Sequence, residues 1–240
     1  MPVSARKLVY DVVRKANAFN TGAGKAFSVL DVVSVINDAY EIIVENNIKQ
    51  TDISSNVRDN LRKLEVKNFE LQLEDMGDYY FAKYPDNLYK RLNHVVEATC
   101  VGCKNSKRII PRLVQSDDLY EARRNPYRQA DFAWEQLIMD EGADGFFIYT
   151  DNKMDLSKVI IDYYRKINYI QAPSLVDCND NIYYDYNDNL ISKDVDFDLD
   201  STYIARKITD VAVLLLKADT KDSESFNLKL SQITNLEKLI

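Results

Sequence analysis

The sequence is poor in glycine and histidine and lacks any long apolar run. Six glycines and a single histidine, His94, occur among 240 residues. A serine or cysteine nucleophile is usually activated by a nearby base, most often histidine, and many enzymes hold substrates in glycine-rich loops. The longest apolar run, residues 211–216, is far shorter than the roughly 20 residues that span a bilayer. These scarcities count against an enzyme and against a membrane-spanning helix.

Cysteine is also scarce. Cys100, Cys103 and Cys178 cannot all pair internally, and a disulfide framework in a chain of this size would normally use more cysteines. This count favours a reducing compartment. Residues 1–7 include charge at Arg6 and Lys7 but no unbroken apolar stretch follows them, so we expect no secretion signal.

Charge is distributed unevenly along the chain. The formal net charge is −7, yet residues 1–128 carry 20 basic and 17 acidic side chains while residues 129–240 carry 11 and 21. Affinity for phosphates comes from cations. An acidic C-terminal half therefore argues against wrapping nucleic acid as the main activity, although such a protein can still surround DNA.

Apolar residues recur at helical spacing near both ends of the chain. The pattern predicts helices at residues 4–19, about 28–47 and 54–68, the first two capped by Ser4 and Ser28. Helix returns after residue 200, and a last helix begins near residue 223. The face predicted for the helix after residue 200 comprises Ile204, Ile208, Val211, Leu215 and Ala218.

Between these helices the period changes to that of strands. Phe69, Leu71 and Leu73 alternate with polar residues, which predicts a half-buried strand. Other strand candidates are residues 79–81, 95–100, 107–110 and 182–184, while 127–141 fits a short helix or a strand. Residues 145–149 and 159–164 are interpreted as a β-hairpin with a long polar connection.

These elements predict an α+β fold in two parts. A helical bundle formed by the N- and C-terminal segments, residues 1–68 and 200–240, carries an inserted antiparallel β-rich region, residues 69–199. Residues 177–200 contain eight aspartates and only one lysine, so we expect an exposed acidic loop there, at the end of the inserted region.

Three motifs have weak claims to chemistry. Residues 22–25 (GAGK) lack the spacing of a phosphate loop, and Ala26 stands where that motif has Ser or Thr. Cys100 and Cys103 form a lone C-x-x-C pair, which would need Cys178 and His94 to complete a zinc site. The acidic loop lacks the Gly and Glu of a calcium-binding EF-hand. We therefore expect no cofactor, no metal and no catalytic residue.

The sequence offers stronger candidates for interaction surfaces than for catalytic or metal sites. A basic loop with Arg123, Arg124 and Arg128 could contact nucleic acid, but pairing with the acidic surface of a neighbouring subunit fits the charge asymmetry better. Clustered tyrosines such as residues 79–80, 163–164 and 183–184 suit either an interface or ordinary strands. The predicted terminal helix bears an apolar stripe that would dock on a partner or pack in the core. This stripe consists of Phe226, Leu230, Ile233, Leu236 and Ile240.

The order of elements resembles that of a known family. Residues 28–37 (SVLDVVSVIN), 159–165 (VIIDYYR) and 201–208 (STYIARKI) with their continuation to 216 are similar to head-to-tail connector proteins of short-tailed bacteriophages, and more closely to virion structural proteins of crAss-like phages. The resemblance covers the element order over most of the chain and includes no catalytic signature.

The resemblance implies a subunit of a twelvefold ring between portal and tail, in the neck of a virion assembled in the host cytoplasm. Its partners would be copies of itself, the portal protein, and adjacent ring or tail proteins; DNA would pass without sequence-specific contact. An acidic lining of this DNA channel would repel the duplex. The candidate lining comprises Asp177, Asp180, Asp185, Asp188, Asp194, Asp196 and Asp198. Another virion structural or interaction protein is the alternative, and an enzyme is the third.

Overall fold

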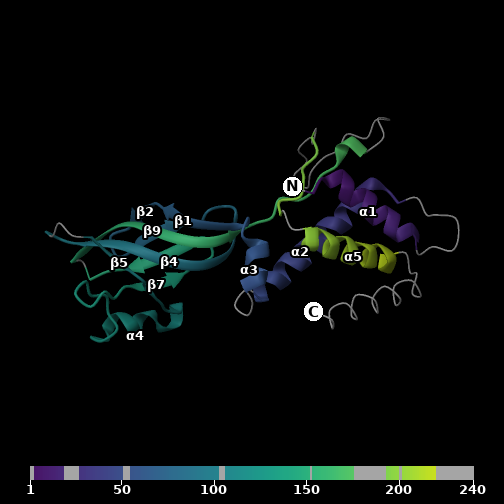
Figure 1. Ribbon diagram of the computed structural model, residues 1–240. Coiled ribbons are helices and arrows are strands. Elements are labelled where there is room, and N and C mark those ends of the chain that lie inside the picture. The colour runs from purple at the N-terminus through teal and green to yellow at the C-terminus, as the bar shows by residue number, and fades with distance from the viewer. Residues whose placement is uncertain are drawn as a thin grey trace. The chain divides into compact units, whose positions relative to one another are not determined.

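The chain folds into helices and mainly antiparallel sheets, which confirms the predicted α+β class (Figure 1). The computed structural model describes residues 3–18, 27–50, 55–102, 106–151, 153–175, 193–199 and 202–219. It divides into two compact units: unit 1 holds Met1–Leu64 and Ile167–Ile240, and unit 2 holds Glu65–Lys166. Helices from both ends of the chain thus share one unit. The second boundary follows Lys166, whereas the sequence pattern predicted it after residue 199.

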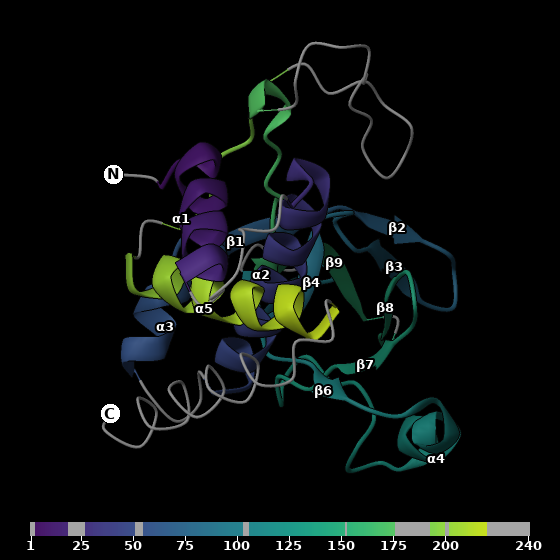
Figure 2. The same cartoon turned by 90° about the vertical axis from the view of Figure 1, so that its right-hand side faces the viewer.

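Unit 1 is built on helices that pack along apolar faces. Its helices are α1 (Ala5–Ala18), α2 (Val29–Gln50), α3 (Ser55–Leu61) and α5 (Thr202–Asp219). The Ser4 hydroxyl accepts the Lys7 N–H at 3.2 Å, and the Ser28 hydroxyl accepts the Leu30 N–H at 3.2 Å. Both predicted caps are therefore present. Helix α5 packs against α1 and α2 (Figure 2).

The buried face of α5 differs from the predicted one. Ile204 and Ile208 are buried as expected, but Val211 and Leu215 are partly exposed. Ala212 and Leu216 take the inner positions instead, because α5 meets two helices at once and its buried face is wider than a single i, i+4 row. The Ala218 side chain lies outside the described residues.

The third predicted helix is shorter than expected. Helix α3 ends at Leu61 instead of continuing to residue 68, and strand β1 (Glu65–Leu71) begins four residues later. Pairing with the strand Met154–Arg165 recruits Glu65 opposite Tyr164 and overrides the local helical pattern. Asn68 lies within this strand at φ 53°, a bulge conformation that asparagine tolerates, and its N–H donates to Asp162 Oδ1 at 2.8 Å.

Unit 2 contains two sheets over a shared apolar core. The first has strand order β1-β9-β4-β5 and the second β2-β3-β8-β7-β6. The remaining strands are β2 (Leu73–Asp75), β3 (Tyr80–Lys83), β4 (Leu88–Cys100), β5 (Ser106–Ile109), β6 (Arg112–Leu113), β7 (Ile138–Glu141), β8 (Gly145–Tyr149) and β9 (Met154–Arg165). All pairs are antiparallel except β6 with β7. Buried residues of both sheets form one cluster, which includes Val96, Phe146 and Ile161.

The predicted hairpin is wrong, although both of its strands exist. β8 pairs with β3 and β7 in one sheet, while β9 pairs with β1 and β4 in the other. β9 starts at Met154, inside the stretch interpreted as a polar connection, because Met154 and Leu156 are buried. The chain therefore crosses between the sheets. Gly145 fits β8 because a Cβ there would lie 2.2 Å from the Ala82 carbonyl oxygen.

Several other predictions can now be placed. Strands β3, β4 and β5 overlap the candidates at residues 79–81, 95–100 and 107–110, and β4 starts seven residues earlier than predicted. Only the end of residues 127–141 is regular, as strand β7. The candidate strand at 182–184, the GAGK stretch and the predicted helix from residue 223 lie outside the described residues.

Candidate interaction surface

The chain makes a long excursion between β5 and β7 in unit 2. It contains β6, a 3₁₀ turn (Ser116–Asp118) and the short helix α4 (Leu119–Arg124). Main-chain hydrogen bonds of 2.8 Å from Arg112 to Leu137 and 2.9 Å from Val114 to Met139 fix its first part on the sheet. Behind α4, Ala122 packs with Val114 and Ile138. The excursion is thus anchored on a small core of its own.

This excursion carries the most exposed large apolar side chains of the described residues. Tyr127 is 88% exposed, Trp134 78%, and Tyr120 and Ile110 are each 70% exposed. Single exposed apolar residues are normal on a protein surface, but here the four most exposed large apolar residues of the described chain fall within one excursion. Because tyrosine, tryptophan and arginine are the residue types that dominate protein–protein contact energies, the excursion is the best candidate for a functional surface.

Arginines of α4 lie over aromatic rings. The Arg124 guanidinium is 5.2 Å from the centre of the Tyr120 ring and donates to the Tyr120 hydroxyl at 2.7 Å. The Arg123 guanidinium is 4.9 Å from the centre of the Tyr149 ring. Such stacking holds a guanidinium in place while leaving its other donors exposed. These two arginines, with Tyr120, Tyr127 and Arg128, are called the α4 surface below.

The chain after α4 turns sharply and is well ordered by hydrogen bonds. The Asn125 side-chain oxygen accepts the Tyr127 N–H at 2.9 Å, and the Asn125 carbonyl accepts the Arg128 N–H at 2.9 Å. Asparagine next to Pro126 is typical of such turns. The turn places Tyr127 and Arg128 directly after the helix, so both belong to the same exposed stretch.

Trp134 sits on a second turn in the excursion. Asp131 and Gln136 exchange two main-chain hydrogen bonds of 2.9 Å, and the Asp131 carboxylate accepts the Trp134 N–H at 3.0 Å. Lys107 of β5 forms an ion pair of 3.0 Å with Glu135 of this turn. The Lys107 ammonium also lies 5.0 Å from the centre of the Phe132 ring. These contacts hold the turn that presents Trp134 to solvent.

A polar network joins the two sheets of unit 2 near the start of the excursion. Glu141 accepts hydrogen bonds from the Tyr84 hydroxyl at 2.7 Å and from Arg91 at 2.9 Å. Burial of Tyr84 and its hydrogen bond to Glu141 raise the pKa of the phenol well above its ordinary value. The Arg91 guanidinium also lies 5.3 Å from the centre of the Phe146 ring.

His94 continues this network. Arg91 donates to His94 Nδ1 at 2.5 Å, so Nδ1 is the acceptor and Nε2 carries the proton, facing the Pro111 carbonyl at 3.3 Å. Burial first, and the Arg91 charge second, lower the pKa of the imidazole. Because its acceptor nitrogen is blocked by a guanidinium, His94 is poorly placed to act as a general base.

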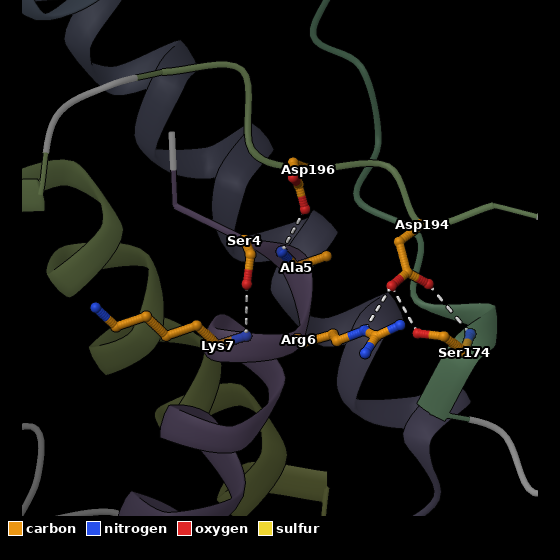
Figure 3. Close-up of polar contacts among 7 residues, drawn as sticks. All are labelled: Ser4, Ala5, Arg6, Lys7, Ser174, Asp194 and Asp196. Carbon is orange, nitrogen blue, oxygen red and sulfur yellow. Dashed lines mark hydrogen bonds and ion pairs between the residues drawn. The ribbon is translucent and has the colours of Figure 1, made fainter. Parts of the chain in front are cut away.

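The three aspartates of the proposed lining that the structure describes all accept hydrogen bonds from residues of unit 1, and Figure 3 shows two of them, Asp194 and Asp196. Asp194 accepts from Arg6 Nε at 2.8 Å and from the Ser174 hydroxyl at 2.6 Å. Burial raises the pKa of Asp194, but these hydrogen bonds outweigh it and the pKa lies below its ordinary value. Asp196 accepts the Ala5 N–H at the start of α1, at 2.9 Å. These contacts fasten the returning chain to α1.

Asp198 behaves in the same way, since it accepts the N–H of Asn168 at 2.9 Å and its side-chain amide at 3.2 Å. The other four lining candidates, Asp177, Asp180, Asp185 and Asp188, lie outside the described residues, as do the five residues of the terminal apolar stripe. The channel lining and the docking stripe therefore stay predictions.

The remaining candidates are dispersed. Cys100 ends β4, while Cys103 and Cys178 lie outside the described residues. In the described part of the chain, no group of three or more His, Cys, Asp or Glu side chains could hold a metal ion. Among the described helices, none has the length and apolar character needed to cross a membrane.

The tyrosine clusters separate into two kinds. Tyr163 and Tyr164 are buried in unit 2, as ordinary strand residues are, and Tyr80 is partly buried. The most exposed aromatics among the described residues are Tyr127, Trp134 and Tyr120 instead. Tyr127 lies in the basic loop that was predicted to contact a neighbouring subunit, whereas Tyr120 and Trp134 were not assigned to an interface. The i, i+4 spacing of Tyr120 and Arg124 after two aspartates was the available signal, because it places both on one face of a short helix.

The comparisons with known proteins name no family. No protein-family model matches this chain, and no curated protein has significant sequence similarity to it.

Proposed function

We propose that this chain is a structural subunit of a phage head-to-tail connector ring, placed between portal and tail around the DNA channel. The observation that supports an assembly role is the excursion between β5 and β7. It presents Tyr120, Tyr127 and Trp134 to solvent together with Arg123 and Arg124. A surface of this composition fits protein contact better than catalysis.

The arrangement of the chain is a second support. The helices before Glu65 and after Lys166 belong to one unit, and the residues between them form a separate β unit. This order agrees with the resemblance to connector proteins in residues 28–37, 159–165 and 201–216. In such a subunit, unit 1 would form the wall of the ring and unit 2 would meet neighbouring proteins.

The charge of the chain suits a protein that surrounds DNA without holding it. A net charge of −7 disfavours tight binding to phosphates, since that affinity grows with the number of cations that contact the backbone. Sliding of the duplex through a ring requires weak contact. The same charge does not distinguish a connector from another virion protein, so the test must locate the chain.

Two measurements test the proposal. Native mass spectrometry of the purified chain, alone and with its portal, should give a closed assembly of about twelve copies of the 27.7 kDa chain. Electron microscopy of virions with a label on this chain should place the label at the portal vertex. A label elsewhere on the particle would favour a different virion structural protein, and a label absent from virions would reject the proposal.

The terminal apolar stripe of Phe226, Leu230, Ile233, Leu236 and Ile240 is proposed to dock on the portal or an adjacent ring. A chain ending after Thr220 should then fold but fail to take its place in the virion. A matched full-length chain with Lys229→Glu, a charge change beside the stripe, should still assemble. Normal incorporation of the truncated chain would contradict docking through this segment.

A further inference from the structure

The three arginines of the α4 surface are exposed. Among the residues that the structure describes, no carboxylate forms an ion pair with Arg123, Arg124 or Arg128, whereas Arg6 and Arg91 each have one. Stacking on Tyr149 and Tyr120 already orders Arg123 and Arg124. A partner that supplies carboxylates would therefore lose little side-chain entropy on ordering these groups.

The chain itself contains a segment of complementary composition. Residues 167–192 include Asp177, Asp180, Asp185 and Asp188 but no lysine or arginine, and three tyrosines fall at residues 183–186. Carboxylates match the planar donor groups of arginine, and tyrosines match an aromatic surface. In composition and charge, this segment is a suitable ligand for the α4 surface.

We propose that the α4 surface of one copy binds the acidic segment 177–188 of a second copy. The inference rests on the proposed function in that it identifies the contact between neighbouring subunits. The two partners are different parts of the chain, because α4 is part of unit 2 and the acidic segment follows that unit in the sequence. A contact between two different surfaces is head-to-tail, and head-to-tail contacts close into rings when their rotation permits.

Nucleic acid is the competing occupant and is less favoured. Asp117, Asp118 and Glu121 are exposed at the start of the same helix and its preceding turn, where they would face phosphates. Their like charge would weaken binding to a phosphate backbone. An acidic peptide bound at the C-terminal end of α4 meets Arg123 and Arg124 in the last turn of the helix, where carboxylates are attracted to the arginines.

Charge exchange on the full chain tests the contact. One variant carries Arg123→Glu, Arg124→Glu and Arg128→Glu; the other carries Asp177→Lys, Asp180→Lys, Asp185→Lys and Asp188→Lys. Each alone should weaken self-association, measured by sedimentation velocity, by at least about tenfold. An equimolar mixture should restore self-association when the two variants alternate. The glutamates of one variant then face the lysines of the other, and the remaining contacts pair native arginines with native aspartates.

The matched control reverses three exposed cations elsewhere, with Lys7→Glu, Arg62→Glu and Lys90→Glu, and should associate as the unmodified chain does. Circular dichroism checks that every variant folds. Association that survives both reversals would overturn the proposal. So would association restored only when both reversals are in one chain, since that result indicates docking within a single copy. Loss of binding to a double-stranded DNA fragment without loss of association would assign the surface to nucleic acid and also overturn it.

A peptide probe covers the case of a chain that stays monomeric until it meets its portal. A synthetic peptide of residues 176–189 should bind the full chain in which the four aspartates of its own segment are changed to asparagine. Binding should weaken by at least about tenfold in the arginine variant, and rising salt should weaken it further. A monomeric chain that does not bind this peptide refutes the contact.

The outcomes separate the inference from the proposed function. Virions with this chain at the portal vertex, unaffected by either reversal, would refute the contact and leave the ring proposal standing. Charge-dependent association of a chain located elsewhere in the particle would support the contact and refute the ring proposal.

Discussion

Arg91 of β4 and Glu141 of β7 form an ion pair of 2.9 Å between the two sheets of unit 2. The Arg91 side chain is only 18% exposed, and Glu141 also accepts from Tyr84. The pair lies beside Phe146, whose ring contacts both Arg91 and Tyr84. It therefore links the sheets at the edge of their shared core.

Loss of the Glu141 carboxylate should destabilise unit 2. Glu141→Ala leaves the partly buried Arg91 charge and the Tyr84 hydroxyl without this acceptor, and we expect a loss of about 1–3 kcal/mol in unfolding free energy. Urea denaturation measures it. The control Glu74→Ala removes an exposed carboxylate from edge strand β2 and should change stability by less than about 0.5 kcal/mol. Equal effects of the two changes would show that the ion pair contributes nothing specific.

The stability of the chain should depend on pH through His94. Its pKa is lowered in the folded chain, so the unfolded chain binds the proton more readily. Stability is therefore complete above the unfolded pKa near 6.5 and falls as the pH drops from there towards the folded pKa. Between pH 7.5 and 5.5 the loss from this one group is at most about 1.4 kcal/mol.

Because His94 is the chain's single histidine, the variant His94→Gln isolates the effect. Its unfolding free energy should change less between these two pH values than that of the unmodified chain. NMR titration of the imidazole gives the folded pKa directly. A folded pKa at or above 6.5, or an unchanged pH dependence in the variant, would contradict this account.

Local patterns predicted α1 and α2 well, α3 and the face of α5 only in part, and the strand partners poorly. The serine caps of α1 and α2 depend on neighbours within one turn, so Ser4 and Ser28 were recognisable from sequence. The partner of β8 depends on residues far along the chain. Residues 145–149 and 159–164 both form strands as predicted, but nothing in either segment indicates that Met154 is the start of β9 and leads into the other sheet.

The candidate surface was only partly predictable for a similar reason. Arg123, Arg124 and Arg128 were recognised as a basic cluster, but α4 has six residues, too few for a periodic pattern to establish a helix. The network of Tyr84, Arg91 and Glu141 could not be found at all from spacing, since Arg91 and Glu141 are 50 residues apart. Exposure of Tyr127 and Trp134 likewise follows from packing that the sequence does not reveal.

A single asparagine should be important for unit 1. The Asn37 amide of α2 donates to the Ile170 carbonyl at 3.0 Å, and its oxygen accepts the Ile170 N–H at 2.8 Å. Asn37→Ala leaves both main-chain groups of buried Ile170 without these partners, which should cost about 2 kcal/mol. Hydrogen exchange at the Ile170 amide should also become faster.

The neighbouring change Asp38→Ala is the control, because Asp38 is exposed on the same helix. It should leave both stability and exchange at Ile170 nearly unchanged. Unaltered exchange at Ile170 in Asn37→Ala would mean that other contacts hold the segment after β9 against α2.

Trp134 offers a direct reading of whether the excursion is buried on assembly. It is the single tryptophan of the chain and is 78% exposed, so acrylamide should quench its fluorescence strongly in the isolated chain. If the part of the excursion that carries Trp134 binds a protein partner, acrylamide quenching should fall several-fold in the assembly, because an aromatic side chain buried in a contact loses its access to solvent. A control reporter combines Trp134→Phe with Tyr10→Trp on α1, where the native side chain is 66% exposed. The control should quench equally before and after assembly if only the excursion is covered; unchanged quenching of Trp134 itself would place the contact elsewhere.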